Sequence, residues 1–233
     1  MQLGRVSGLQ KERSCEAFDN AGVARLDCLS LESASSMRVL VACEYSGVVR
    51  NAFIALGHDA LSCDLLPTES PGPHVQGDVC RLLRERWDLI VAHPPCNDLA
   101  ASGAQYWPRK QIDGRQQRAI EFFLKIIDSP CARIAVENPV GIMGTVYRKA
   151  DQIVQPWMFG EPFNKKTCFW LKGLPPLVPT DVVKPTHNWG SNSFRSGSRK
   201  NSPLPSMHWG SKERAKSFSG IAAAMASQWG CLK

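Results

Sequence analysis

Two side chains that can do chemistry each follow a short apolar run. Cys96 follows the run at 89–92 within the segment His93-Pro94-Pro95-Cys96, and Glu137 follows the run at 133–136 directly. Short apolar runs that end in turn residues are typical of buried parallel strands. Ligands bind at the carboxyl ends of such strands. A thiol and a carboxylic acid at the same edge of the sheet can act together on an electron-poor ring. The sulfur attacks a ring carbon, and the acid supplies a proton.

Strands and helices alternate from residue 37 onward. We expect strands at 38–43, 60–63, 74–76, 88–92, 133–136 and 167–172, and helices at 48–56, 79–86, 115–128 and 218–229. This alternation predicts a parallel sheet with right-handed crossovers. The expected fold class is therefore α/β, with a doubly wound, mostly parallel sheet.

Composition divides the chain further. We expect residues 1–36 to be an N-terminal extension with little structure, and 37–178 with 214–233 to form the main domain. The length of the polar stretch 97–114 is typical of a mobile functional loop. Residues 179–213 read as a small irregular basic insertion. Between 180 and 216 the basic residues outnumber the acidic ones: Lys184, Arg195, Arg199, Lys200, Lys212, Arg214 and Lys216 against Asp181 and Glu213.

Size and charge exclude several classes of protein. The 233 residues carry a formal net charge of +7, and 43% of them are hydrophobic, which suits one α/β domain and favours a polyanionic partner. No apolar run approaches the ~18 residues of a membrane span, and no signal-peptide pattern is present, so we expect a cytoplasmic protein. The nine cysteines include no C-x-x-C pair, which predicts free thiols and no metal site.

The motifs together resemble those of the cytosine-C5 DNA methyltransferases. Pro94-Pro95-Cys96 matches the motif that holds the nucleophile of that family, and Glu137-Asn138-Pro139 matches its cytosine-binding motif. Phe159-Gly160-x-Pro162 resembles the eighth motif and Phe218-x-Gly220 the tenth. The resemblance covers about residues 37–229. Chain length resembles the short, phage-type members, some of which belong to restriction-modification systems, with a reduced target-recognition region.

The resemblance implies a Rossmann-like fold that uses S-adenosylmethionine and a reaction at C5 of a flipped cytosine in DNA. Cys96 would add to C6, as a thiolate suits. Glu137 would hold a proton at N3, for which we expect burial to raise its pKa. Pro95, Asn138 and Lys165 complete the expected catalytic set. No metal is implied, and we expect a monomer.

The methyl donor is expected at the turns that follow the first three strands. The resemblance places its methionine end at the turn after the first strand, its ribose at an acid after the second and its adenine at an acid after the third. The residues expected to bind S-adenosylmethionine are Glu44, Tyr45, Ser46, Gly47, Asp64, Asp78 and Pro94.

The chain departs from the family pattern at three places. Only Gly47 remains of the usual glycines in the first motif, and Glu44 brings negative charge there. Lys165 and Thr167 stand where the eighth motif carries two arginines, and lysine lacks the rigid fork of arginine. Gly220 is followed by Ile221 rather than asparagine. The recognition region at 179–213 is also small for reading a specific site of several bases. These departures bear on donor affinity, base positioning and sequence specificity.

Three alternatives remain open. An amino-group methyltransferase would use a Pro-Pro motif without a covalent step, but His93 and Cys96 fit that motif poorly and leave Glu137 without a role. A non-catalytic nucleic-acid-binding descendant of the fold would explain the reduced glycine motif. Modification of single-stranded DNA or of a free nucleotide would suit the small recognition region.

Overall fold

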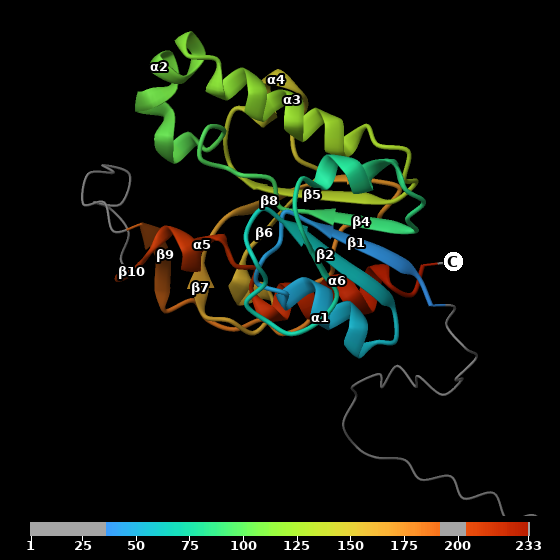
Figure 1. Ribbon diagram of the computed structural model, residues 1–233. Coiled ribbons are helices and arrows are strands. Elements are labelled where there is room, and N and C mark those ends of the chain that lie inside the picture. The colour runs from blue at the N-terminus through green and yellow to red at the C-terminus, as the bar shows by residue number, and fades with distance from the viewer. Residues whose placement is uncertain (1–35, 192–203, 233) are drawn as a thin grey trace, which may run out of the picture. The chain divides into compact units, whose positions relative to one another are not determined.

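Seven strands form the main sheet in the order β3-β2-β1-β4-β5-β8-β6 in the computed structural model, which describes residues 36–191 and 204–232 (Figure 1). Strands β1 to β5 pair in parallel, whereas β8 is antiparallel to both β5 and β6. The expected doubly wound, mostly parallel α/β sheet is confirmed. The strands are β1 (Arg38–Ala42), β2 (Asp59–Asp64), β3 (His74–Gln76), β4 (Leu89–Ala92), β5 (Ile134–Pro139), β6 (Gln152–Val154) and β8 (Thr167–Lys172).

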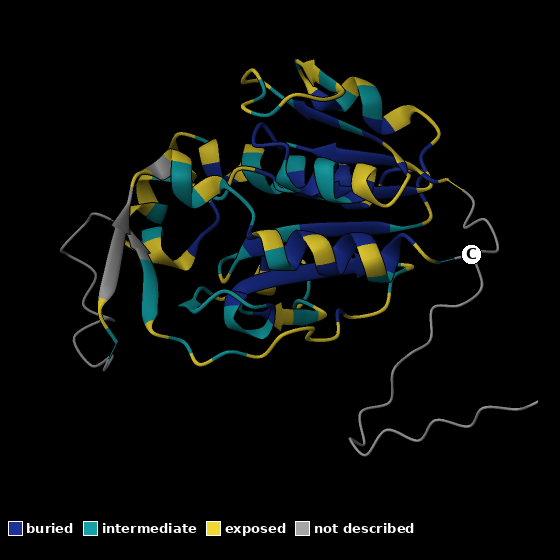
Figure 2. Cartoon of the chain, turned by 90° about the horizontal axis from the view of Figure 1, so that it is seen from below, coloured by how far each residue is buried: buried dark blue, intermediate teal, exposed yellow. Residues whose placement is uncertain are grey.

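Helices cover both faces of this sheet. On one face α1 (Val48–Ala55) and α6 (Ser219–Trp229) pack with Val39, Val41 and Phe169 in one apolar cluster. On the other face α3 (Arg115–Ile127) packs Phe123 and Ile126 into a second cluster, and η1 (Val79–Arg84) and α4 (Met143–Val146) border it. Figure 2 shows the strands buried between helices whose outer sides are exposed. The helix expected at 115–128 is confirmed as α3, which is amphipathic because its buried side chains lie toward the sheet.

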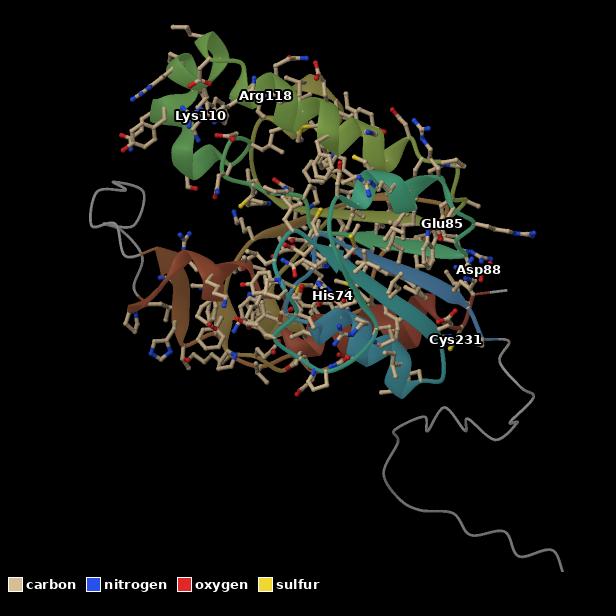
Figure 3. The ribbon with its side chains drawn as sticks, viewed as in Figure 1. His74, Glu85, Asp88, Lys110, Arg118 and Cys231 are labelled. Carbon is tan, nitrogen blue, oxygen red and sulfur yellow. The ribbon has the colours of Figure 1, made fainter. Side chains whose placement is uncertain are left out.

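Residues 97–114 are helical and not an open loop. They contain η2 (Ala101–Tyr106) and α2 (Trp107–Ile112), and Lys110 of α2 binds the carboxylate of Asp98 at 3.1 Å. Figure 3 labels Lys110 at the end of the molecule where α2 lies. The prediction of a long loop was therefore wrong, because its polar residues form a helix that lies largely in solvent.

The C-terminal part is more regular than expected. A second sheet of three parallel strands joins β7 (Phe163–Asn164), β9 (His187–Ser191) and β10 (Ser206–Trp209), followed by α5 (Ser211–Ala215); η3 (Pro156–Met158) precedes it. Residues 179–213, predicted to be irregular, thus contribute two strands. Residues 1–35 and 192–203 lie outside the described part of the chain, so the extension expected at 1–36 stays a prediction.

The segments that resemble the eighth and tenth motifs pack against each other. The carboxylate of Glu161 accepts hydrogen bonds from the backbone N–H and hydroxyl of Ser219, both at 2.8 Å, at the start of α6. A Cβ at Gly220 would overlap the carbonyl oxygen of Phe159. Glycine is therefore required there by close backbone approach, and this contact fixes α6 against the chain that leads into β7.

Candidate active site

A cleft of about 1020 Å³ opens at the carboxyl ends of the parallel strands. Its walls come from the turns after β1 and β4, from the ends of β2 and β5, from η2, from the segment before β8 and from α5. Ten residues that the sequence predicted for the site line it: Glu44, Tyr45, Ser46, Asp64, Pro94, Pro95, Cys96, Glu137, Asn138 and Lys165. Its volume lies at the upper limit for a single drug-sized ligand, which leaves room for a donor and a base together.

The loop that carries Cys96 is held by hydrogen bonds to its own turn and to β5. The carbonyl of Cys96 accepts from the backbone N–H groups of Leu99 and Ala100, at 3.0 and 2.9 Å. The side-chain amide of Asn138 donates to the carbonyl of Pro94 at 2.9 Å. Asn138 and Pro139 are part of β5 and not of a loop after it. Asn138 fixes the neighbouring loop from a strand.

Glu137 lies inside β5, opposite Phe169 of β8, and not after the strand as expected. Nδ1 of His93 lies 3.3 Å from its Oε2. Burial raises the pKa of Glu137, but the hydrogen bond from His93 and the positive charge of Lys165 outweigh burial, so the pKa lies below its ordinary value. The expectation of a raised pKa was therefore wrong, since it took burial into account without the two partners.

The Cys96 thiol is held in its protonated form in this arrangement. Burial and the negative charge of Glu137 raise its pKa, while the positive charges of Lys165 and Arg214 act in the opposite direction. A thiol is a weak nucleophile until it loses its proton. Neutralising Glu137 would remove one of the two causes that raise the pKa, so the state of the carboxyl group and the reactivity of the thiol are coupled.

A cationic wall faces these two groups. Nζ of Lys165 donates to the backbone carbonyl of Arg214 at 3.1 Å and lies 5.4 Å from the ring centre of Phe218. Nε of Arg214 is buried and has no hydrogen-bond partner within the described residues. Lys212 lines the same wall. The wall can therefore offer positive charge to an anionic or electron-rich ligand.

The turn after β1 is closed on itself by Glu44. Its carboxylate accepts from the backbone N–H of Val49 at 2.7 Å and of Arg50 at 3.2 Å, and from the hydroxyl of Ser46 at 3.2 Å. The N–H groups of Val49 and Arg50 belong to the first turn of α1, so the Glu44 carboxylate occupies the N-terminus of this helix. The N-terminus of α1 thus compensates the negative charge that Glu44 brings to this turn.

Two predicted donor-binding residues lie outside the lining of the cleft. Asp78 instead caps η1, where its Oδ1 accepts from the N–H of Cys80 at 2.9 Å. Gly47 is the N-cap of α1 with φ 75°, and its position serves the turn rather than the cavity wall. An acid at a strand end can cap the next element as readily as bind a ligand, which is why sequence position alone misplaced Asp78.

Sequence reasoning missed His93, Tyr106 and Arg214 as lining residues. His93 belongs to the same motif as Cys96. Its position directly after β4 was the feature of the sequence that could have identified it as a lining residue. Tyr106, at the end of η2, brings an aromatic side chain from the helical segment to the cleft. Arg214 carried no signal beyond its positive charge, because α5 reaches the cleft only through tertiary folding.

Metal binding finds no support in the described residues, among which no group of three or more histidine, cysteine, aspartate or glutamate side chains is arranged to hold an ion. Nor is any helix in 36–191 or 204–232 long and apolar enough to cross a membrane. The cysteines of these ranges are free thiols.

No protein-family model matches this chain, and no curated protein matches its sequence. A prophage-encoded E. coli protein described as a DNA modification methyltransferase is similar in structure, with a TM-score of 0.44, 18% identity and coverage of 64% of this chain and 52% of that one. The Entamoeba histolytica methyltransferase EhMeth gives 0.41 and 12%, with coverage of 64% and 58%. The S. pombe Dnmt2 methyltransferase gives 0.43 and 13%, with coverage of 60% and 51%. The chain thus spans between 51% and 58% of the length of these three structures.

Proposed function

We propose that this chain transfers a methyl group from S-adenosylmethionine to C5 of cytosine in DNA, through a covalent adduct on Cys96. One observation carries the proposal: Cys96 and Glu137, from the ends of neighbouring strands β4 and β5, line one cleft, and the charge of Glu137 raises the pKa of the Cys96 thiol. A nucleophile beside an acid is the arrangement that addition to a pyrimidine ring requires.

The chemistry assigns a role to each group. The C5 position of cytosine is a poor nucleophile until sulfur has added at C6 and pushed electron density toward C5. Cys96 forms the S–C6 bond, and Glu137 faces the N3 and amine edge, where N3 takes up a proton. Lys165 and Arg214 supply positive charge on the wall that faces Cys96. Loss of the C5 proton then allows the sulfur to leave.

The donor side of the cleft suits S-adenosylmethionine. This molecule carries an ammonium group and a sulfonium centre, and Glu44 and Asp64 place carboxylates on the turns after β1 and β2. One Asp64 oxygen accepts from the N–H of Leu66 at 2.9 Å, and an acid at this strand end commonly binds ribose hydroxyls. When bound, S-adenosylmethionine supplies the methyl group; Glu44, Tyr45 and Ser46 would hold its methionine end.

DNA is the proposed partner. A base stacked inside a duplex cannot enter such a cleft, so the cytosine must be flipped out or come from a single strand. The formal charge of +7 and the cations at Lys165, Lys212 and Arg214 favour a phosphate-rich substrate.

A product analysis tests the proposal. The protein is incubated with DNA and S-adenosylmethionine labelled in its methyl group, and the DNA is then digested to nucleosides. We expect the label in 5-methyldeoxycytidine. Label in N4-methyldeoxycytidine would support an amino-group methyltransferase instead, and no label on duplex DNA, single strands or deoxycytidine nucleotides would support a binding role. Parallel reactions on the three substrates separate duplex from single-strand and nucleotide modification.

A further inference from the structure

Glu137 has a neighbour that can store a proton near neutral pH. Nδ1 of His93 lies 3.3 Å from Oε2 of Glu137, and the His93 side chain is 7% exposed. Histidine is the side chain that ordinarily changes charge between about pH 5 and 8. The backbone N–H of His93 donates to the carbonyl of Ala42 at 2.9 Å, which fixes the residue at the end of β4.

Glu137 alone does not hold the proton that N3 of the cytosine takes up. Its pKa lies below the ordinary value, because the hydrogen bond from His93 and the charge of Lys165 outweigh the effect of burial. Near neutral pH Glu137 is therefore a carboxylate, which can only accept hydrogen bonds. N3 of cytosine is also an acceptor, so the two would repel unless a proton lies between them.

We propose that the proton for N3 is stored on His93 and passes to the base through the carboxyl group of Glu137. This deepens the proposed function and rests on it. As the S–C6 bond forms, the C5=C6 electron pair shifts toward C4, the C4=N3 pair moves onto N3, and N3 takes the proton. His93 is left as neutral imidazole beside the Glu137 carboxylate. When the C5 proton is lost to water and sulfur leaves, N3 returns its proton to the pair.

The second ring nitrogen of His93 supports this assignment. Nε2 is buried and has no hydrogen-bond partner within the described residues, although His93 lines the cleft. An imidazolium ion donates from both nitrogens, so a bound substrate or water that accepts from Nε2 would stabilise the charged ring. Substrate binding and proton storage would then favour each other.

Other titratable groups around the pair do not take this role. Burial, first among the causes, raises the pKa of the Cys43, Cys96 and Cys168 thiols, which keeps all three protonated near neutral pH. Glu44 is engaged by the helix N-terminus. The groups that face the pair are Cys43 and Glu44 after β1, Cys96 after β4, Lys165 before β8, Cys168 on β8 and Arg214 on α5.

The test measures the rate of covalent adduct formation on DNA containing 5-fluorocytosine from pH 5 to 8. The reaction needs the Cys96 thiolate and a protonated acid. The thiolate fraction rises about tenfold per pH unit below the thiol pKa. The protonated fraction of an ordinary histidine is constant at low pH and falls above a pH of about 6.5. For the wild type we therefore expect a rate that rises with pH and then levels off within this range.

His93→Asn is the informative variant, because its amide nitrogen can occupy the place of Nδ1 and donate to Glu137 but holds no titrating proton. Glu137 must then be protonated from solvent, and that fraction falls as the thiolate fraction rises. We expect a rate that is level from pH 5 to 8 and about 10²-fold below the wild-type plateau, the ratio of the ordinary acid constants of histidine and glutamate. His187→Asn, in β9 outside the cleft lining, is the matched control and should keep the wild-type profile.

The outcomes separate the two proposals. If the wild type forms no adduct, the proposed function fails. If the wild type forms an adduct and His93→Asn shows the same rate and the same pH profile, the proton store on His93 is contradicted while the function stands. Nitrogen chemical shifts of the His93 ring in the whole wild-type protein give a second reading that does not depend on the variant folding. The proposal expects a ring that takes up its second proton within the range of the adduct assay, and a ring that stays neutral from pH 8 down to pH 5 contradicts it.

Discussion

Asn138 and Pro94 join the two halves of the candidate active site, because the Asn138 amide on β5 donates to the Pro94 carbonyl at 2.9 Å. The strand that carries Glu137 is thereby tied to the loop that carries Cys96. This bond sets the relative position of the nucleophile and the acid together with the His93–Glu137 contact at 3.3 Å and the parallel pairing of β4 and β5.

Removing that bond should reduce both activity and stability. Asn138→Ala leaves the Pro94 carbonyl unpaired, which costs about 1–3 kcal/mol of unfolding free energy. A displacement of the nucleophile by about 1 Å can lower the rate about 10²-fold. Adduct formation and thermal unfolding are measured on the same preparation. An Asn138→Ala protein as stable and as active as the wild type would show that the bond does not position Cys96.

Gly141 holds the loop after Cys96 by close contact. A Cβ at this position would overlap the carbonyl oxygen of Leu99, whereas a Cβ at Gly144 in α4 meets nothing within 4 Å. We expect Gly141→Ala to cost about 1–3 kcal/mol and to lower activity. Gly144→Ala, the matched control, should be neutral or stabilise by up to about 1 kcal/mol. Equal denaturation midpoints for the two variants would contradict the close approach of the loops after β4 and β5.

The reactivity of Cys96 should follow the charges around it in the absence of DNA. Glu137→Gln removes a charge that raises the thiol pKa, so the thiolate fraction at pH 8 should increase and alkylation should be about 3–10-fold faster. Lys165→Met should slow it by a similar factor. Mass spectrometry follows Cys96, with the exposed Cys231 as an internal control. Alkylation of Cys96 that changes in the opposite direction in either variant would overturn the electrostatic account.

Arg50 anchors the segment that reaches α5. Its buried guanidinium donates to the Ser62 hydroxyl at 2.9 Å and to the carbonyls of Ser70 and Pro71 at 2.8 and 3.0 Å. Glu69 in the same segment binds Lys212 and Lys216. Arg50→Met should lower the free energy of unfolding by about 3 kcal/mol or more, because several buried acceptors lose their donor.

Arg118 provides the comparison for Arg50. It lies exposed on α3 (Figure 3), and Arg118→Met should change stability by less than about 0.5 kcal/mol. Chemical denaturation of both variants checks the difference. Equal losses would mean that Arg50 contributes no more than a surface residue.

Much of the sheet could be predicted from the sequence, because short apolar runs mark its strands. The apolar runs before Cys96 and Glu137 form β4 and β5, and the strand at 74–76 was predicted with its observed bounds. The extension of β5 through Pro139 could not be predicted, because it depends on pairing with β8 about thirty residues later. Residues 97–114 were misjudged because their helix buries little apolar surface.

Site electrostatics depended on partners that are distant in sequence. The direction of the Glu137 pKa shift is set by His93 and Lys165, which belong to other segments of the chain. Glu44 was expected to disturb a ligand, yet it accepts from the N–H groups of Val49 and Arg50. Asp78 was predicted to bind the methyl donor because it follows a strand, but its side chain caps η1 instead. Residue type and position suggested the site, but only the fold determined its charges.

Covalent trapping tests the central claim most directly. DNA in which 5-fluorocytosine replaces cytosine is incubated with the protein and S-adenosylmethionine, and the wild type is compared with Cys96→Ser on a denaturing gel. Fluorine at C5 blocks the elimination step, so the account predicts a stable protein–DNA band for the wild type and none for Cys96→Ser. Absence of the band on both duplex and single-stranded DNA, or its persistence in Cys96→Ser, would contradict a covalent C5 reaction through Cys96.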